Sequence, residues 1–229
     1  MGPMLNEFTP LELVHDGVRL AAWRAGSGPA LLLLHGHPQT HVMWHRVAPA
    51  LAEQFTVVLM DLRGYGDSSR PVATSAEVYA KRTMAADAHA LMAQLGFPAY
   101  QVLAHDRGAR VAHHAGAVQQ LMLLDIAPTL AMYAQTSEAF ARAYWHWFFL
   151  IQPPPLPEAL IASDPARYVR SVMGKRHAGL AAFAPEALAE YERCVAIPGT
   201  AEAICEDYRA SAGIDLDHDR ADVARGQKL

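Results

Sequence analysis

The stretch Val102-Leu-Ala-His-Asp-Arg-Gly-Ala-Arg110 joins a short apolar run to a segment of helical composition. The apolar run, Tyr100 to Ala104, predicts a buried strand, and the residues after it predict a tight turn into a helix. A strand, a sharp turn and a helix in this order are typical of a nucleophile elbow, which holds a reactive side chain above a parallel sheet. The residue at the tip of this elbow is Asp106, and Gly108 leaves room for the turn two positions later.

An aspartate at this position has two interpretations. As a nucleophile, its carboxylate attacks carbon and forms an ester intermediate, and the N-terminus of the following helix favours the ionised form. As a structural residue, it caps the helix, which is common for an aspartate that follows a strand. The nine residues alone leave both interpretations open.

The surrounding sequence predicts strands that alternate with helices. Asp16-Gly17 predicts a hairpin turn between the strands Leu11 to His15 and Val18 to Arg24. Buried strands are expected at Ala30 to Leu34 and Phe55 to Met60, a further strand at Leu121 to Leu124, and helices at Thr40 to Phe55 and Ser75 to Leu95. This alternation predicts an α/β fold with a mostly parallel, doubly wound sheet.

Polar residues follow several of the expected parallel strands directly. They are His35 to Pro38, Asp61, Asp106 and Asp125. Because ligands of such sheets bind at the carboxyl ends of the strands, we expect the functional site at this edge. His35 is more typical of a structural hydrogen-bonding residue than of a catalytic one.

After Pro128 the pattern changes to helices separated by proline-rich breaks. We therefore expect an N-terminal core over residues 1–128, a helical cap over 129–217 that covers the strand ends, and a return segment over 218–229. The run Asp215 to Asp222 is expected to be a solvated, charged turn, and His218 a solvated loop residue.

Composition excludes several classes of function. The 229 residues carry a net charge of −4, which gives no electrostatic reason to bind nucleic acid or an anionic membrane. Two cysteines without metal-ligand spacing and the absence of a recognisable signal peptide predict a reduced, cytoplasmic protein. We expect neither a metal nor another cofactor, and apolar runs are too short to span a bilayer. The oligomeric state stays open, and a homodimer is compatible with an exposed sheet edge or cap.

The motifs together resemble those of the haloacetate (fluoroacetate) dehalogenases of the α/β-hydrolase superfamily. The resemblance covers essentially the whole chain. Its most specific parts are His105-Asp-Arg-Gly-Ala-Arg110 and Tyr144-Trp-His-Trp-Phe-Phe149, while His35-Gly-His-Pro-Gln-Thr40, Asp61-Leu-Arg-Gly-Tyr-Gly-Asp-Ser68 and Asp125-Ile-Ala-Pro128 are less specific. It implies an α/β-hydrolase fold with a helical cap, and hydrolysis of short haloacids with water.

The resemblance also implies roles for the first reaction step. Asp106 would displace halide from the α-carbon, and Arg107 and Arg110 would hold the substrate carboxylate. The departing halide would be held by His146, Trp147 and Tyr208. Each implied ligand has a structural alternative: the arginines as helix-surface charges, His146 and Trp147 as core aromatics of the cap, and Tyr208 as interfacial packing.

For ester hydrolysis, the resemblance implies that Asp125 orients a water-activating histidine and that the His37 backbone N–H stabilises the oxyanion. Asp125 could instead cap the next segment. The histidine of the family follows two further strands after the cap, and we expect both strands and this histidine to lie outside the present sequence. The sheet edge at the Leu121 strand is then expected to expose apolar side chains. The connection from Arg107 to about Ala117 is also short for a parallel crossover.

Two other functions remain open at this stage. Epoxide hydrolases share the aspartate nucleophile, and Tyr133, Tyr144 or Tyr208 could protonate an epoxide oxygen. Against this function, Arg107 and Arg110 would place two cations beside a neutral substrate. A fragment that binds substrate without repeated turnover is the second alternative.

Overall fold

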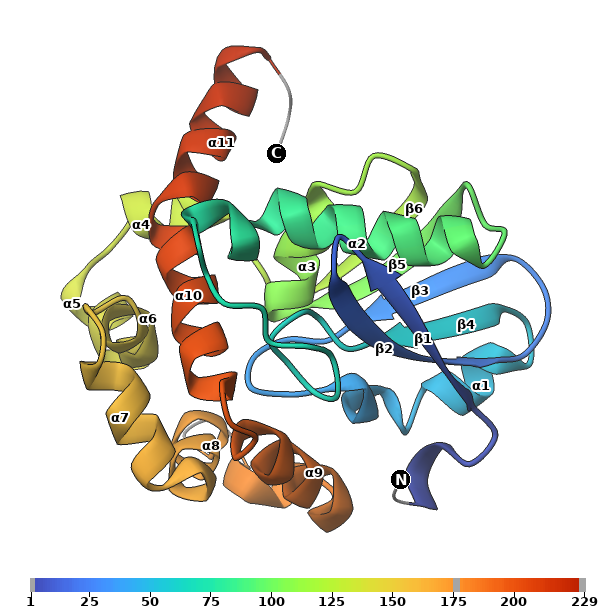
Figure 1. Cartoon of the computed structure of the whole chain (residues 1–229), viewed down its shortest axis with the longest axis horizontal. Helices are drawn as coiled ribbons and strands as arrows, with labels where there is room; N and C mark the ends of the chain where they lie inside the picture. The colour runs from blue at the N-terminus through green and yellow to red at the C-terminus, as the bar shows by residue number, and fades with distance from the viewer. Residues whose placement is uncertain (1–2, 175–177, 227–229) are drawn as a thin grey trace.

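The computed structural model describes residues 3–174 and 178–226, and its centre is a six-stranded sheet (Figure 1). The strand order is β1-β2-β4-β3-β5-β6, in which β1 and β2 run antiparallel to their neighbours and β3 to β6 are parallel to one another. The strands are β1 Thr9–His15, β2 Val18–Ala25, β3 Ala30–Leu34, β4 Thr56–Met60, β5 Tyr100–His105 and β6 Val118–Leu124. This confirms the mostly parallel α/β sheet.

The two central strands are buried on both faces. Every residue of β3 and β4 is buried, and successive side chains belong to two separate apolar clusters. Leu32 and Leu34 pack into the larger cluster, whereas Leu31 and Leu33 pack into the smaller one. The alternation follows from the two-residue period of a strand, and it explains why these segments are continuously apolar.

The predicted hairpin forms with Asp16 and Gly17 at its tip. Both residues have positive φ angles, 47° and 75°, as a two-residue turn with matching twist requires. His15 pairs directly with Val18 across the turn. Asparagine, aspartate and glycine tolerate this conformation better than other residues, which is why the Asp-Gly pair predicted it.

Two of the predicted helices are shorter than expected. Residues 40–55 form a 3-10 turn, His41–Trp44, followed by α1, Ala48–Ala52, with a proline in its first turn. In the second region a 3-10 turn, Ala76–Tyr79, precedes α2, Lys81–Gln94, because Ala80 has an extended backbone. The Lys81 N–H, which has no partner within the helix, donates to the Asp215 carboxylate at 2.8 Å.

The short connection after β5 closes without a long helix. Helix α3, Asp106–His113, and a four-residue link lead directly to β6, which pairs in parallel with β5. The register of this pair shifts between Tyr100 and Gln101, so the pairing contains an irregularity at the start of β5.

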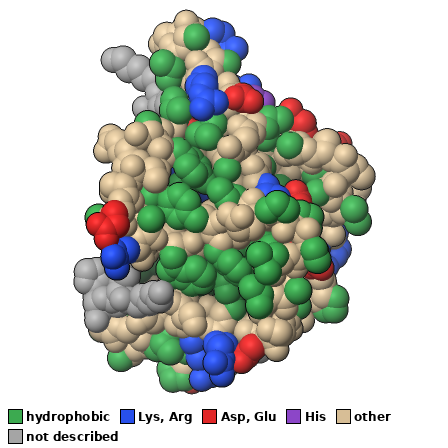
Figure 2. Space-filling view, turned by 90° about the vertical axis from the view of Figure 1, so that its left-hand side faces the viewer, with side chains coloured by type: hydrophobic (Ala, Val, Ile, Leu, Met, Phe, Trp, Pro, Cys, Tyr) green, Lys and Arg blue, Asp and Glu red, His purple; other side chains and the backbone are tan. Residues whose placement is uncertain are grey.

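Helices after β6 group to one side of the sheet (Figure 1). They are α4 Thr129–Ala134, α5 Glu138–Ala143, α6 Trp145–Leu150, α7 Leu156–Ser163, α8 Pro165–Met173, α9 Pro185–Val195 and α10 Thr200–Ala212. We refer to these seven helices and the described segments that join them, residues 129–174 and 178–212, as the cap. Hydrophobic side chains gather across the centre of this side of the molecule, and charged ones lie mostly toward its periphery (Figure 2). Within the described ranges, no helix has both the length and the apolar character needed to cross a membrane.

The expectation of a solvated turn at residues 215–222 is wrong. These residues lie in helix α11, Ile214–Ala224, so the predicted boundary at residue 217 falls inside a helix. Three of its four aspartates, Asp215, Asp219 and Asp222, are buried, whereas Asp217 is exposed. Two of the buried ones meet partners on the core: Asp215 caps α2, and Asp222 accepts from Arg82 at 2.6 Å. His218 is half-buried rather than solvated. Of the predicted return segment, residues 227–229 lie outside the described residues.

Strand β6 is the edge of the described sheet, and its apolar side chains are exposed. Leu121 is 44% exposed and Met122 61%, and the next two leucines are similar. The expectation that this strand exposes apolar side chains is therefore confirmed. Contiguous exposed apolar residues on a strand edge favour pairing with other strands.

Gly108 provides a test of the tight turn between β5 and α3. A Cβ at this position would lie 2.5 Å from the His35 carbonyl oxygen, which is backbone and cannot rotate away. We expect Gly108→Ala to lower the free energy of unfolding by about 1–3 kcal/mol in urea denaturation. Gly116→Ala is the control, because a Cβ at that position would have no other atom of the described residues within 4 Å. It should leave stability unchanged or raise it by up to about 1 kcal/mol. Equal effects of both variants would contradict this description of the turn.

Candidate active site

Asp106 begins α3 in a strained conformation. Its φ angle is +47°, which L residues other than glycine rarely adopt. The neighbouring chains approach closely: the Gly108 N–H donates to the His35 carbonyl at 2.9 Å, and a Cβ at Gly36 would lie 2.6 Å from the Asp106 Cβ. The strand, turn and helix therefore have the geometry of a nucleophile elbow with Asp106 at its tip.

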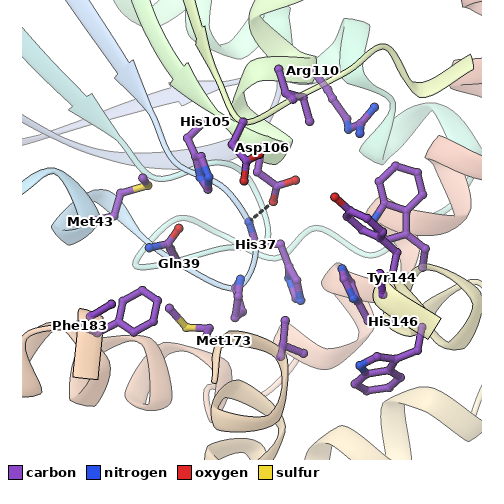
Figure 3. A pocket seen from close by; sticks show the side chains of 18 of the residues that line it. His37, Gln39, Met43, His105, Asp106, Arg110, Tyr144, His146, Met173 and Phe183 are labelled. Atoms are coloured by element: carbon purple, nitrogen blue, oxygen red, sulfur yellow. Dashed lines mark hydrogen bonds between the residues drawn. The ribbon is translucent and has the colours of Figure 1, made fainter. Parts of the chain in front are cut away.

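The Asp106 carboxylate is held in its ionised form. Its Oδ2 accepts a hydrogen bond from the His37 backbone N–H at 2.9 Å (Figure 3). Burial opposes ionisation, but the nearby His105, Arg107 and Arg110 and the His37 N–H together lower the pKa of Asp106 below its ordinary value. A carboxylate that stays ionised while partly shielded from water can act as a nucleophile.

A cavity of about 660 Å³ opens beside Asp106, between the carboxyl ends of the strands and the cap. The core contributes polar side chains and the cap contributes mostly aromatic and apolar ones (Figure 3). The lining includes His37, Gln39, His105, Asp106, Arg110 and Asp125 from the core, and Tyr144, His146, Trp147, Met173 and Phe183 from the cap. The sequence prediction of a site at this edge of the sheet agrees with this position.

Two residues predicted at the same edge have structural roles. His35 is fully buried, its Nε2 accepts from the Leu62 N–H at 3.1 Å, and its Nδ1 lies 3.0 Å from the Gly36 carbonyl. Asp61 accepts from the His41 backbone N–H at 2.7 Å and contacts the His41 ring. Both residues fix the loops that surround the cavity.

Arg110 lies in the cavity lining, close to Asp106. Its Nη1 donates to the Thr129 hydroxyl at 2.5 Å, and its guanidinium carbon lies 4.8 Å from the centre of the Trp147 ring. Within the described part of the chain its Nε is buried and has no hydrogen-bond partner. Burial and the nearby Arg107 lower the pKa of Arg110 to about 10, so the side chain remains a cation at neutral pH. The interpretation of Arg110 as a helix-surface charge is wrong, because the residue is buried.

Arg107 has a different environment. It is fully buried, and its Nε and Nη2 donate to the two carboxylate oxygens of Asp207 at 2.9 and 2.7 Å. Nη2 also donates to the Ser211 hydroxyl at 2.6 Å. Only Nη1 lacks a hydrogen-bond partner among residues 3–174 and 178–226. Most of the donor capacity of Arg107 therefore serves the contact with α10.

The three residues implied in halide binding converge from two cap helices. His146 and Trp147 come from α6 and Tyr208 from α10, and the ring of Tyr208 lies 6.0 Å from that of His146 and 6.3 Å from that of Trp147. Tyr208 is buried beneath Arg107, whose guanidinium carbon is 4.2 Å from the ring centre. Burial and then the charge of Asp106 raise the pKa of Tyr208 well above its usual value, so the phenol keeps its proton.

Asp125 directly follows β6 with a φ angle of +49° and lines the cavity. It is exposed. In the described ranges, no histidine forms a hydrogen bond or an ion pair with its carboxylate. The position of Asp125 after β6 agrees with the role that the resemblance implies for it. The histidine expected to pair with Asp125 is not found among the described side chains.

A buried ionic network behind the cavity was not anticipated from the sequence. The Asp207 carboxylate contacts Arg107 and Lys81 and accepts from the Tyr65 hydroxyl at 2.7 Å. Burial opposes its ionisation, but the charges of Arg107 and Lys81 lower the pKa of Asp207 far below the usual range. Because Asp207 precedes Tyr208, this network fixes the position of Tyr208 over Arg107. In the sequence, Asp207 stands in the charged run Glu206-Asp-Tyr-Arg209, and such a run on a helix usually faces solvent.

Comparisons with known proteins agree with this fold and site. Residues 29–190 match the family model of the alpha/beta hydrolase fold. A fluoroacetate dehalogenase from Burkholderia sp. is 46% identical over 207 residues, which cover 87% of this chain and 68% of the relative. A soluble epoxide hydrolase from Corynebacterium sp. is 35% identical over 226 residues, covering 94% and 77%. The crystal structure of ALR0039 from Nostoc sp. superposes with a TM-score of 0.93 at 51% identity, covering 96% of this chain and 77% of that chain.

The chain therefore belongs to the α/β-hydrolase fold family. A carboxylate at the elbow, a cation in the same cavity and an aromatic cap define the chemistry available to it. The relatives include both dehalogenases and epoxide hydrolases, so the family alone does not select the substrate.

Removal of the Asp207 charge tests the buried network. Asp207→Asn should lower the free energy of unfolding at pH 7 by about 3–5 kcal/mol, because Arg107 and Lys81 lose their buried counter-charge. A carboxylate with a depressed folded pKa contributes stability above its unfolded pKa and loses this contribution as the pH falls through the folded value. The difference between the parent and Asp207→Asn should therefore be complete at neutral pH and shrink below pH ~4.

Urea denaturation across this pH range measures the effect. Asp217→Asn is the matched control, since Asp217 is exposed on α11 and, among the residues that the structure describes, pairs only with the exposed Arg220 at 2.8 Å. It should change stability by less than about 1 kcal/mol. A pH-independent difference for Asp207→Asn would show that the Asp207 charge does not stabilise the fold.

Proposed function

We propose that the protein is a hydrolytic dehalogenase that cleaves the carbon–halogen bond of short haloacids, such as fluoroacetate, through an ester on Asp106. The observation that carries the proposal is the pairing of an ionised elbow carboxylate with the buried Arg110 in one cavity. A haloacid needs both groups, since its carbon must meet a nucleophile and its carboxylate needs a cation. The 46% identity to a fluoroacetate dehalogenase supports the same function.

In the first step, the substrate carboxylate binds the guanidinium of Arg110 and the remaining donor of Arg107. An oxygen of Asp106 then attacks the α-carbon from the side opposite the halogen. A carbon–oxygen bond forms, the carbon–halogen bond breaks, and the halide leaves with the bonding electron pair. The ring and hydroxyl donors of His146, Trp147 and Tyr208 stabilise the negative charge that develops on the halide.

In the second step, water attacks the carbonyl carbon of the ester and releases the hydroxy acid. The His37 backbone N–H, which contacts Asp106 Oδ2, is placed to stabilise the oxyanion. Asp125 is the residue proposed to orient a histidine that activates the water.

Epoxide hydrolysis is the competing activity, because an epoxide hydrolase is also similar over most of the chain. Its substrate is neutral and gains nothing from a buried cation next to the nucleophile. Of the tyrosines that could protonate an epoxide oxygen, Tyr144 lines the cavity, whereas Tyr208 packs against Arg107. Activity toward a short epoxide, measured beside fluoroacetate, separates the two functions.

Replacement of the nucleophile is the principal test of the proposed function. Asp106→Asn should abolish the rapid release of halide from fluoroacetate and chloroacetate, because a neutral amide is a poor nucleophile. Halide released per protein molecule is measured with an ion-selective electrode, which also separates one stoichiometric burst from sustained turnover. Halide release near the parent rate would contradict the assignment of Asp106. A burst without turnover would support ester formation and show that ester hydrolysis does not follow in this chain.

Arg110→Lys tests carboxylate recognition. Lysine keeps the positive charge but lacks the planar pair of donors, so we expect the apparent affinity for chloroacetate to fall by about tenfold or more. Arg142→Lys is the control, because Arg142 is exposed and pairs with Glu138 on the surface of α5. Unchanged affinity in Arg110→Lys would place carboxylate recognition elsewhere, and an equal loss of affinity for a neutral epoxide would favour the competing function.

A further inference from the structure

The side chain of His37 lies among the residues proposed to bind halide. Its ring centre is 5.3 Å from that of Tyr208 and 6.3 Å from that of His146, and the ring is buried at the cavity wall. Figure 3 shows the rings of His37 and His146 side by side below Asp106. The proposed reaction involves only the backbone N–H of His37 and gives no role to its imidazole.

The two ring nitrogens of His37 have different environments. Nε2 lies 2.9 Å from the hydroxyl of Tyr168 in cap helix α8. Nδ1 is buried and has no hydrogen-bond partner in the described residues. Buried polar atoms without partners are rare in folded proteins. Because His37 lines the cavity, a group bound there can supply the missing partner of Nδ1.

The imidazole is neutral at physiological pH. Burial and the neighbouring His146 lower the pKa of His37 to about 3. A neutral imidazole carries one proton, and when the Tyr168 hydroxyl donates to Nε2, that proton resides on Nδ1. Tyr168 keeps its own proton, because burial raises the pKa of this phenol well above its usual value.

We propose that His37 Nδ1–H is a further donor to the departing halide and that Tyr168 positions it by fixing the tautomer. This inference rests on the proposed dehalogenase function and adds a specificity-determining residue to it. As the Asp106 oxygen bonds to the α-carbon, the halide leaves with the electron pair of the broken bond, and its negative charge favours the tautomer with the proton on Nδ1. No proton needs to be transferred in this step, so His37 acts only as a hydrogen-bond donor.

The donor should matter most for fluoride. Fluoride is small, accepts strong hydrogen bonds and is a poor leaving group, whereas bromide leaves readily with weak support. Loss of one donor to a developing anion therefore costs more for fluoroacetate than for bromoacetate. The predicted signature is a change in the ratio of the two rates rather than an equal loss of both.

Three variants separate the roles of the ring. His37→Phe removes both nitrogens and retains a ring, His37→Asn places an amide donor near the position of Nδ1, and Tyr168→Phe removes the hydroxyl that fixes the tautomer. None of them removes the backbone N–H that contacts Asp106. The measurement is the rate of the first halide release from fluoroacetate and from bromoacetate, followed by rapid quenching.

We expect His37→Phe to lower the fluoroacetate-to-bromoacetate rate ratio by about 10- to 100-fold. His37→Asn should restore most of the ratio, and Tyr168→Phe should lower it in the same direction by a smaller factor. An unchanged ratio in His37→Phe, or equal losses in His37→Phe and His37→Asn, would overturn the inference. Both outcomes are distinct from failure of the proposed function, in which the parent chain itself releases no halide from either acid.

Discussion

The site depends on the close approach of two backbone segments, residues 35–37 and residues 106–108. A positive φ angle at this residue lifts its carboxylate above the sheet, and glycines at positions 36 and 108 leave the space that this requires. The same approach brings the His37 N–H to 2.9 Å from Oδ2. One local constraint thus sets the direction of the Asp106 carboxylate, the position of the His37 N–H and the start of the helix that carries both arginines.

The cap is tied to this core through a buried carboxylate rather than through apolar packing alone. Asp207 of α10 meets Arg107, Lys81 and Tyr65, which come from three separate parts of the core. An ionic contact of this kind has a defined geometry, and it places the adjacent Tyr208 against the guanidinium of Arg107. Arg107 is therefore a residue that positions the cap, and among the described residues only its Nη1 has no hydrogen-bond partner.

Local sequence was sufficient to predict the parts of the molecule that obey short-range rules. The apolar runs of β3 and β4 are continuous because both faces are buried, and the Asp-Gly hairpin and the elbow turn have strong local preferences. The resemblance supplied the roles of the residues around the cavity, and these roles remain proposals.

Long-range contacts explain what the sequence did not reveal. Asp207 and the aspartates of helix α11 stand in stretches of sequence that look polar. Tertiary contacts with Arg107, Lys81 and Arg82 bury Asp207, Asp215 and Asp222. The same limit applies to the His37 ring, because its partner Tyr168 is 131 residues away in the chain. A histidine next to a proline in a loop carries no signal for such a contact.

The most direct measurement is the mass of the protein after reaction with fluoroacetate and rapid acid quenching, followed by peptide mapping. We expect one carboxymethyl ester per chain, located on the peptide that contains Asp106 and absent from Asp106→Asn. Fluoride release without an ester on Asp106, or an ester on a different residue, would contradict the central claim that this aspartate is the nucleophile.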